Sequence, residues 1–586
     1  MSTNTVRPRC FARSRIAPGA LALALAFGAQ QGAAQTPQEV QRAQQEQLRL
    51  QLEQQQREQQ RRRELEERLR TPRGEDLRPP PVPAPQKPDE RCFEIREVRL
   101  EGVTKLSDAE QAELTRPYTG RCVGLGQVNE LIQKVTNLYV SRGFTTTRAY
   151  VPEQDLRSGV LRILVLEGLV EKILLEGEGV SLATAFPDLE GKVFNLRDFE
   201  QGIDQVNRLR SNSATLDIEP GAAPGASVVK IRNAPAKPWA FGISLDNTGS
   251  DASGLYQGTA SLGWDNPLGL NDFVNVSWRQ NPDAEPDRKL TVAHSLYYAV
   301  PYGSWLFSAT ASRFESASTV QGGVISFLSS SESVTQGVRA DRMMLRDQFL
   351  KLTLATGLTL KDNRAFLNRE LISVSSRKLT VLDGGASLAV NAWGGLWSFD
   401  AGFAQGLDAA GALTDAPGLP DIAPRAQFFK WTFGASFNRP LRLAGHMLSL
   451  QSSVTGQHSR DVLYGTEQIL IGGPFSVRGF RDTAVSGDSG FYWRNELGLP
   501  LPLQQVFGEA APPGVLRPYV GYDVGRVFDK HGVPGGTLAG TTIGLHLAAA
   551  PLSLQLGYSR PHRASARLAP TADEDRYTYV RIALDF

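Results

Sequence analysis

Few side chains in this 586-residue chain have the types and spacing that catalysis or metal binding requires. The chain contains no HExxH, P-loop or GxSxG motif, and the segment GLGQVN departs from the dinucleotide-binding fingerprint at its last position. The histidines are scattered and show no ligand-like spacing; they are His294, His446, His458, His531, His546 and His562. The sequence therefore predicts no catalytic residue, no metal site and no cofactor, and we expect a protein that is not an enzyme.

One cation is nevertheless conspicuous. Arg478 lies in the glycine-rich segment IGGPFSVRGF, residues 471–480, between two stretches that alternate apolar and polar residues. Such an arginine either stays in solvent, bound to nothing, or binds a carboxylate elsewhere in the chain. The formal net charge of +2 gives no reason to expect a polyanion as its partner, so nucleic-acid binding is not among the candidate functions.

The first residues predict export from the cytoplasm. Four arginines precede the apolar run IAPGALALALAFGA, which is too short to span a bilayer and is followed by small residues. We interpret residues 1–34 as a secretory signal peptide. Its removal takes Cys10 away and leaves Cys92 and Cys122 in an oxidising compartment, where the pair predicts one disulfide; two buried free thiols are the alternative.

Two polar segments come next. Residues 35–71 consist mainly of Gln, Glu and Arg, which favour a helix, but their leucines are too sparse to form an apolar face. The Pro-rich residues 72–91 favour extended polyproline geometry and predict a linker. The helix has no core to join, so it is either a solvated tether or an element that sits in a polar, wet environment.

Residues 92–168 and 169–235 predict two small α/β modules in tandem. In the first module we expect the strand FEIREVRLEG, a helix at SDAEQAEL capped by Ser107, a helix ending at Gly143, a strand at TRAYVP and the strand GVLRILVLEG. The second module repeats this order, and its main helix covers NLRDFEQGIDQVNRLR, residues 195–210.

From residue 236 to residue 586 the apolar residues recur with period two, which is typical of β-strands. In WAFGISLD the apolar side chains share one face; they are Trp239, Phe241, Ile243 and Leu245. Short turns such as DNPLGLND alternate with stretches that we interpret as long polar loops, such as RQNPDAEPDRK and SSSESVTQG. About 350 residues in strands of ~10 residues predict a membrane β-barrel of about sixteen antiparallel strands around a wet lumen.

A large soluble β-sandwich is the alternative, because one packed sheet face also produces alternation. A sandwich would carry more Lys and Glu on its exposed face, whereas here that face holds Ser, Thr, Gly, Asn and Asp. The chain ends with YTYVRIALDF, in which one face carries Val580, Ile582, Leu584 and Phe586. A terminal aromatic residue on a last strand resembles the signal that barrel-assembly machinery reads, so Phe586 is our candidate for that signal.

These segments resemble the recurring blocks of a known family, the outer-membrane transporters of two-partner secretion (TpsB, of the ShlB/FhaC/HecB type), within the POTRA-containing barrel superfamily. The matching blocks cover nearly the whole mature chain in the family's order; they include CFEIREVRLEG, GFTTTRAYVPEQDLRSGVLRILVLEG, NLRDFEQGIDQVNRLRS, SLDNTGS and WDNPLGLND. The resemblance implies a plug helix at 35–71, a linker at 72–91, POTRA modules at 92–168 and 169–235, and a sixteen-stranded barrel at 236–586.

The resemblance also implies a role for Arg478. In the family a loop with a VRG[YF] motif folds back into the lumen and meets an acidic residue of the wall; the motif here is Val477, Arg478, Gly479 and Phe480. The matching wall motif is PYVGYDVGRV, which makes Asp523 the acid. Alternation supports this assignment, because Asp523 then faces inward beside Gly521, whose small size leaves room for a guanidinium. The family often has an aromatic residue where this chain has Gly521, so any ring beside Arg478 must come from Tyr519 or Phe480.

As to function, the resemblance implies a pore that captures a large unfolded exoprotein through its POTRA modules and secretes it to the cell surface without nucleotide hydrolysis. The exoprotein would be adhesin-like or haemolysin-like and would bear an N-terminal secretion domain. Further expected partners are the lipid bilayer, periplasmic chaperones and the barrel-assembly machinery, with the barrel in the outer membrane and the modules in the periplasm. The helix at 195–210 and its neighbouring strand are the candidate capture surface, although we expect its Leu196, Phe199 and Val206 to be core. A barrel-assembly insertase and a passive porin are the alternatives; the first normally carries more modules and the second needs none.

Overall fold

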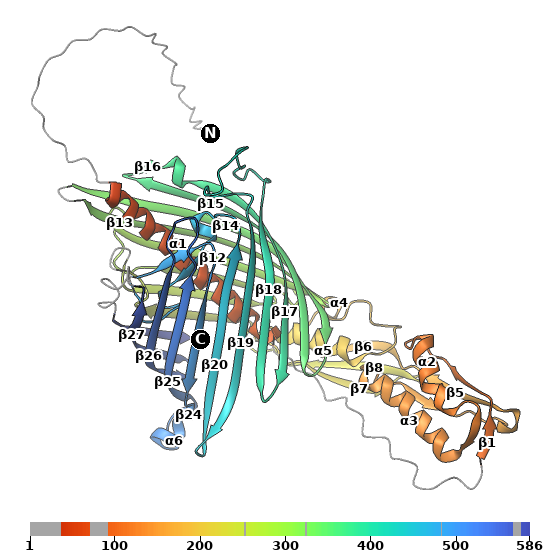
Figure 1. Cartoon of the computed structure of the whole chain (residues 1–586). Coiled ribbons are helices and arrows are strands. Elements are labelled where there is room, and N and C mark those ends of the chain that lie inside the picture. Colours follow the sequence, from red (N-terminus) through yellow and green to blue (C-terminus); the bar gives the residue numbers. More distant parts are fainter. Residues whose placement is uncertain (1–36, 71–91, 251–253, 323–324, 482, 566–575) are drawn as a thin grey trace, which may run out of the picture.

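The computed structural model describes residues 37–70, 92–250, 254–322, 325–481, 483–565 and 576–586. The predicted signal peptide and Pro-rich linker lie outside these residues. Figure 1 shows a β-barrel, a long helix α1 (Pro37–Arg70) that runs inside it, and two small α/β modules at one end. The second module lies against the barrel, and the first projects beyond it.

The first module is built around two helices and five short strands. Its elements are β1 (Cys92–Ile95), β2 (Glu97–Glu101), α2 (Asp108–Thr115), β3 (Arg121–Gly124), α3 (Leu125–Ser141), β4 (Arg148–Tyr150) and β5 (Val160–Leu166). Strands β2, β5 and β4 form one sheet, in which β2 and β5 are parallel, while β1 and β3 form a separate antiparallel pair. The apolar face of α3 covers β5, and Leu131, Val135, Leu161 and Ile163 are fully buried between them.

The segment predicted as the first strand is two strands in two different sheets. The chain changes sheets at Arg96, whose backbone N–H donates to the Gly159 carbonyl oxygen at 2.7 Å. The strand β3, which carries Cys122, has only four residues and was not predicted. The inward side chains are Phe93 and Ile95 before the break and Val98 and Leu100 after it, so the alternation slips by one residue at Arg96 and Glu97. This slip in the sequence marks the change of sheet, and the prediction of one continuous strand overlooked it.

Helix α2 begins as the sequence predicts, at Ser107. Its hydroxyl accepts from the backbone N–H of Glu110, and the Glu110 carboxylate accepts from the backbone N–H of Ser107 at 2.8 Å, which completes a capping box. The side chain of Arg142, just beyond α3, also donates to Glu110. The hydrogen bond from Arg142, together with those from Ser107, lowers the pKa of Glu110 to about 2.

The second module repeats the architecture with one sheet. Its elements are β6 (Leu169–Gly177), α4 (Leu182–Ala185), α5 (Leu196–Asn207), β7 (Thr215–Pro220) and β8 (Ala226–Asn233). The sheet order is β6–β8–β7, so β7 lies at an edge. The core holds three stacked rings, Phe186, Phe194 and Phe199, together with Val206 and Leu196, all buried.

The rest of the chain forms a closed antiparallel barrel in which each strand pairs with the next along the chain. The strands are β9 (Trp239–Asp246), β10 (Gln257–Asp265), β11 (Phe273–Gln280), β12 (Lys289–Tyr302), β13 (Trp305–Gly322), β14 (Ile325–Arg346), β15 (Leu350–Leu367), β16 (Glu370–Leu371), β17 (Arg377–Ala392), β18 (Gly395–Leu407), β19 (Phe429–Leu443), β20 (His446–Ser459), β23 (Gly490–Gly498), β24 (Leu501–Pro502), β25 (Val515–Val527), β26 (Gly536–Ala549), β27 (Leu552–Ala564) and β28 (Tyr577–Asp585). The last strand, β28, pairs with β9 and closes the ring.

The barrel has sixteen full strands among the described residues, which confirms the predicted fold class. Strands β16 and β24 have only two residues each, and the strands on either side of them, β15 with β17 and β23 with β25, pair directly. A short helix, α6 (Leu503–Phe507), lies in the connection between β24 and β25. No described helix is both long enough and apolar enough to cross a membrane.

The side-chain faces of the strands follow the predicted alternation. The apolar face points outward on the first strand, where the exposed side chains are Trp239, Phe241, Ile243 and Leu245. On β25, Val520 and Tyr522 are about half exposed, whereas Tyr519 and Asp523 on the other face are buried. An apolar exterior and a polar interior are what a barrel in lipid requires.

One stretch that we predicted as a long loop is part of a strand. The polar segment SSSESVTQG, residues 329–337, lies inside β14, which has 22 residues rather than ~10. Composition misled the prediction, because serines favour loops in most proteins. Here Ser329 and Ser331 face the lumen, where a polar side chain has polar partners.

Candidate functional site

Helix α1 occupies the barrel lumen and binds the wall through polar side chains. The amide nitrogen of Gln47 donates to Ser318 Oγ at 3.1 Å and to the Ser329 carbonyl oxygen at 3.2 Å. The amide oxygen of Gln47 accepts from the hydroxyls of Ser316 and Ser331. One glutamine is thereby held by four serines of β13 and β14, and the polar strand segment described above supplies two of them.

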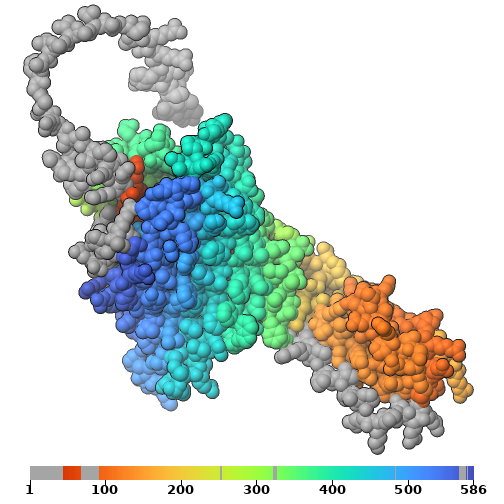
Figure 2. Space-filling view, viewed as in Figure 1, coloured from red at the N-terminus to blue at the C-terminus, as the bar shows by residue number. Residues whose placement is uncertain are grey.

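Farther along α1, arginines bind the wall in the same way. Arg57 Nη2 donates to Thr248 Oγ1 at 3.0 Å, and Arg61 donates to Asn275, Ser277 and Ser295, the last at 3.1 Å. Figure 2 shows only a small part of α1, in red, because the barrel wall covers the rest. A lumen lined by hydroxyls and amides suits the Gln, Glu and Arg side chains of this helix, while its few leucines pack on apolar wall residues, as Leu50 does on Ala293 and Phe314.

The described residues between β20 and β23, 460–481 and 483–489, fold back into the lumen instead of extending from the barrel; we call them the lumen loop. It contains the 3₁₀ turn η4 (Gly465–Glu467) and the paired strands β21 (Ile469–Ile471) and β22 (Val485–Gly487). Ile471, Val477 and Phe480 are fully buried in a small apolar cluster. The loop also contacts α1, since Gln56 Nε2 donates to the Leu470 carbonyl oxygen at 2.9 Å.

Arg478, at the tip of the lumen loop, binds the wall strand β25 through Asp523. Its Nε donates to Asp523 Oδ2 at 2.7 Å and its Nη2 donates to Asp523 Oδ1 at 2.9 Å, so the pair is bidentate. The backbone N–H of Arg478 adds a third bond to Oδ2 at 3.0 Å. Arg478 is 8 % exposed and Asp523 is 1 % exposed, so water has little access to either charge.

A second carboxylate, which the sequence prediction did not include, completes the site. Glu496 on β23 accepts from Arg478 Nη1 at 2.9 Å and also binds Arg517 on β25. Alternation could have found Glu496, because in FYWRNEL it shares a face with Arg494, and the Arg494 side chain donates to the Phe475 carbonyl oxygen of the lumen loop at 3.3 Å. Glu496 lies on β23 and Asp523 on β25, and these two strands are neighbours in the wall. Their separation in the sequence does not show that they pair.

Two glycines make room for this arrangement. A side chain at Gly521 would place its Cβ 2.5 Å from Arg478 Nη2, so the guanidinium occupies the space that glycine leaves. Gly479 has φ +104°, a conformation that other residues rarely adopt, and it lets the chain turn at the wall. The ring beside Arg478 is that of Tyr519, whose centroid lies 5.8 Å from Arg478 Cζ.

At the other end of the barrel the second module is attached to the barrel mouth. In the turn between β10 and β11, Asn271 exchanges hydrogen bonds with the backbone of Ser181, at 3.0 and 2.8 Å, and its amide nitrogen donates to Thr184 Oγ1 at 2.8 Å. Arg208, just after α5, donates to the Asn271 carbonyl oxygen at 2.8 Å, and the backbone N–H of Ser211 donates to Asp265 at 2.8 Å. The segment WDNPLGLND therefore serves as the docking turn for the second module.

Helix α5 does not present the free surface that the sequence suggested. Its Asp204 accepts from Lys351 Nζ at 2.6 Å and from Arg346, both at the module end of β15 and β14. Gln205 Nε2 donates to the Trp305 carbonyl oxygen at 3.3 Å. The polar face of α5 therefore packs on the barrel rim; the prediction was wrong for this face because the sequence did not reveal the basic residues that cover it.

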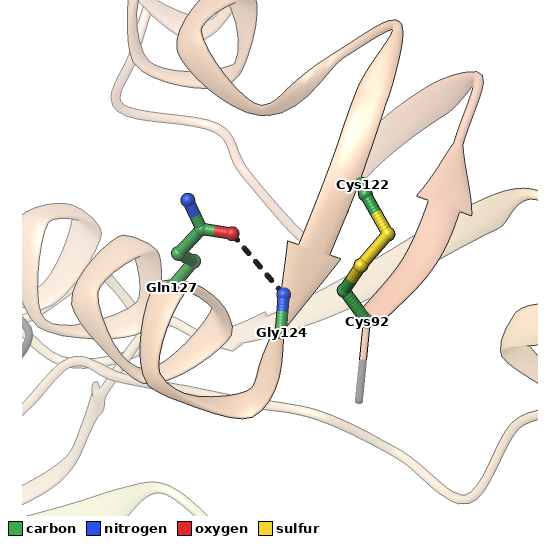
Figure 3. The surroundings of a disulfide bond; sticks show 4 residues. All are labelled: Cys92, Cys122, Gly124 and Gln127. Atoms are coloured by element: carbon green, nitrogen blue, oxygen red, sulfur yellow. Dashed lines mark hydrogen bonds between the residues drawn. A yellow bond between two sulfur atoms is a disulfide. The ribbon is translucent and has the colours of Figure 1, made fainter. Parts of the chain in front are cut away.

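A disulfide joins Cys92 to Cys122 in the first module, which confirms the predicted pairing (Figure 3). It links β1 to β3, the antiparallel pair that lies apart from the main sheet. Beside it, the Gly124 backbone N–H donates to Gln127 at the start of α3 at 3.1 Å. Phe586, at the other end of the chain, is 56 % exposed and exchanges backbone hydrogen bonds with Phe241 of β9.

Comparison with known families agrees with this architecture. Residues 225–547 match the family described as "Haemolysin secretion/activation protein ShlB/FhaC/HecB". Residues 93–168 match the POTRA domain of ShlB type, and residues 169–220 match a further POTRA domain.

Individual relatives are similar over most of their length. The outer membrane transporter CdiB of Dickeya dadantii is 34% identical over 498 residues, which cover 83% of this chain and 87% of that protein. The haemolysin transporter protein ShlB of Serratia marcescens is 32% identical over 482 residues, covering 81% and 84%. The solved structure of CdiB from Escherichia coli superposes with a TM-score of 0.82 at 31% identity, over 95% of this chain and all of that one.

Proposed function

Because the chain belongs to the ShlB/FhaC/HecB family of two-partner secretion transporters in the outer membrane, with its POTRA modules in the periplasm, we propose that it exports one large exoprotein through the barrel lumen. The exoprotein arrives unfolded, is captured by the POTRA modules through an N-terminal secretion domain, and is adhesin-like or haemolysin-like. No nucleotide is hydrolysed, since the chain contains no nucleotide-binding motif. Folding of the exoprotein outside the cell supplies the directional bias.

The observation that carries this proposal is the way in which the lumen is filled. Helix α1 is held mainly by side-chain hydrogen bonds to serines, an asparagine and a threonine, and beside it remains a cavity of about 560 Å³ lined by α1 and the wall. A neutral hydrogen bond such as those of Gln47 contributes roughly 1 kcal/mol and one donated by an arginine roughly 1.5–3 kcal/mol, and each can be exchanged for a bond to water. Such a helix can leave the lumen, whereas an apolar core could not be released in this way. A passive porin has no use for such a removable helix.

Capture of the exoprotein requires a free surface on the modules, and strand β7 supplies one. It lies at the edge of its sheet next to α5, and Ile218 on it is 40 % exposed. An edge strand can pair with an extended segment of another chain by backbone hydrogen bonds, and exposed apolar side chains add affinity. Because α5 packs on the barrel rim, we keep only the neighbouring strand β7 as the candidate capture surface.

Cross-linking of α1 to the wall tests whether the helix must move. Cysteines replace Gln47 and Ser318, whose side chains lie 3.1 Å apart, and a short thiol-reactive bifunctional reagent joins them. We expect the cross-linked transporter to stop secreting its exoprotein, whereas each single-cysteine variant treated with the same reagent secretes normally. Undiminished secretion by the cross-linked protein would show that the exoprotein does not use the space that α1 occupies.

A further inference from the structure

The lumen loop has a second ionic contact with the wall, formed by residues that the motif around Arg478 does not include. Glu467, at the end of η4, accepts from Lys361 Nζ at 2.5 Å and from Lys430 Nζ at 3.1 Å. Lys361 is on β15 and Lys430 is on β19. One carboxylate of the loop thereby joins two wall strands that are separated by β17 and β18.

The backbone of the loop is held at the same point. Lys430 Nζ also donates to the Glu467 carbonyl oxygen at 2.8 Å, and Gln457 Nε2 of β20 donates to the same oxygen at 3.0 Å. The Glu467 side chain is 2 % exposed, and those of Lys430 and Lys361 are 11 % and 15 % exposed. The wall therefore holds both the carboxylate of Glu467 and the backbone of η4 at this residue.

The electrostatics make the Glu467 carboxylate the centre of this contact. Two ammonium groups share one carboxylate in a place with little water, so removal of Glu467 would leave two buried like charges that repel each other. No other carboxylate among the described residues forms an ion pair with either Lys361 or Lys430. The pair of lysines thus requires the loop in its observed position.

The position of Glu467 relates the loop to helix α1. At Gly465, two residues before Glu467, a Cβ atom would meet the side chain of Leu48 of α1 at 2.5 Å, so the turn packs directly on the helix. Leu470, three residues after Glu467, accepts a hydrogen bond from Gln56 of α1. Glu467 and both lysines also line the cavity beside α1. They therefore face the part of the lumen that α1 leaves open.

We propose that Glu467 is a second positioning residue of the transporter: with Lys361 and Lys430 it anchors the first half of the lumen loop, and through it helix α1, to the wall formed by β15 and β19. Arg478 anchors the second half to β25. Each anchor opposes opening of the lumen, so the loss of either one makes opening more frequent. This inference rests on the proposed translocation through the lumen, but its test does not involve an exoprotein.

The test measures ion conductance of the purified full-length transporter in planar bilayers. E467Q removes the charge with little change of shape, and we expect the open probability to rise by at least about tenfold. The triple variant K361M/K430M/E467M removes all three charges together and restores apolar packing, so it returns the open probability toward that of the native protein. E509Q, a variant of an exposed glutamate in the turn before β25, is the matched control and leaves conductance unchanged.

Heat-modifiable electrophoretic mobility shows whether the E467Q barrel is folded. If it is folded and its open probability equals that of the native protein, the proposal is overturned. If E467Q does not reach the membrane, the double variant K361M/K430M serves instead, because it removes both partners of Glu467 without leaving two like charges together. Native conductance of that folded variant likewise overturns the anchor. A change in conductance together with normal secretion by the cross-linked Gln47–Ser318 variant would uphold the anchor and refute the translocation route, so the two ideas fail separately.

Discussion

At Arg478 the balance of burial against pairing determines what the residue does. Removing a guanidinium from water costs several kcal/mol, and only a well-formed set of charged hydrogen bonds offsets that cost. Asp523 supplies two such bonds to the side chain and one to the backbone, and Glu496 supplies another. An arginine so enclosed gives the loop one position, whereas an exposed one would leave it many.

The sequence revealed part of this site and concealed the rest. Alternation along PYVGYDVGRV and the absence of a side chain at Gly521 indicated an inward acid with room beside it. Glu496 was overlooked because its partner lies across the lumen loop, 18 residues away, and nothing in a single strand shows such a contact. Glu467 was concealed for the same reason, since its lysines are 106 and 37 residues away.

Replacement of Arg478 by Ala should impair secretion while leaving the barrel in the outer membrane. Asp523 would then be buried without its cation, which costs about 3–5 kcal/mol and frees the loop from β25, while Glu496 would keep Arg517 as its partner. The measurement is exoprotein in the medium, normalised to the heat-modifiable barrel band. Arg460→Ala, at an exposed arginine of the same loop, is the control. Unchanged secretion by Arg478→Ala would remove this residue from the mechanism.

At the scale of elements, the helices were easier to predict than the short strands. Ser107 and the apolar spacing of α3 mark their helices in the sequence, because caps and period 3.6 are local signals. Strands β1 and β3 have four residues each, and they form only because they pair with each other and are joined by a disulfide. Strand β14 was partly taken for a loop, since the partner that makes its serines useful is a distant helix.

The disulfide should be complete in the mature protein. Thiol alkylation of the non-reduced transporter is expected to label neither Cys92 nor Cys122, and reduction should expose both. In the entropy model a bridge that closes a loop of 30 residues stabilises by about 3.6 kcal/mol, so the double Cys→Ser variant should lose roughly that free energy of unfolding in the first module. The loss of stability is measured by thermal unfolding, with limited proteolysis as the probe of the unfolded first module. Ready labelling without reductant would contradict the prediction.

The edge strand β7 gives a prediction about capture. Ile218→Lys places a charge on the exposed edge and should weaken binding of the exoprotein's secretion domain by about tenfold, or ~1.4 kcal/mol. A pull-down with detergent-solubilised full-length transporter measures this. Leu125→Lys, which changes a more exposed apolar residue in the first module, is the matched control. Equal capture by the two variants would place the binding surface elsewhere.

For the molecule as a whole, the barrel could be predicted from the sequence, whereas the position of helix α1 in its lumen could not. Period two, strand number and polarity of the inner face follow from the lipid outside and the water inside. The place of α1 did not follow, because a helix without an apolar face gives no packing signal and was equally consistent with a solvated tether. Its partners are single serines scattered over several strands.

The proposed energy source concerns the complete transporter and its exoprotein. If folding outside the cell draws the chain through the lumen, an exoprotein engineered to remain unfolded should be secreted more slowly, by about tenfold. The rate of appearance at the cell surface is the measurement, with the native exoprotein expressed at the same level for comparison. An undiminished rate would require another driving force.

The bond between Cys92 and Cys122 has a mechanical meaning as well. Residue 92 is where the segment that follows α1 enters the first module, so tension from a helix leaving the lumen would load β1 first. That strand has four residues and a single neighbour, β3, and backbone bonds in so short a ribbon would unzip one after another. The covalent crosslink between Cys92 and Cys122 would pass such a load to β3 and into α3, so a pull at this edge would not unravel the module.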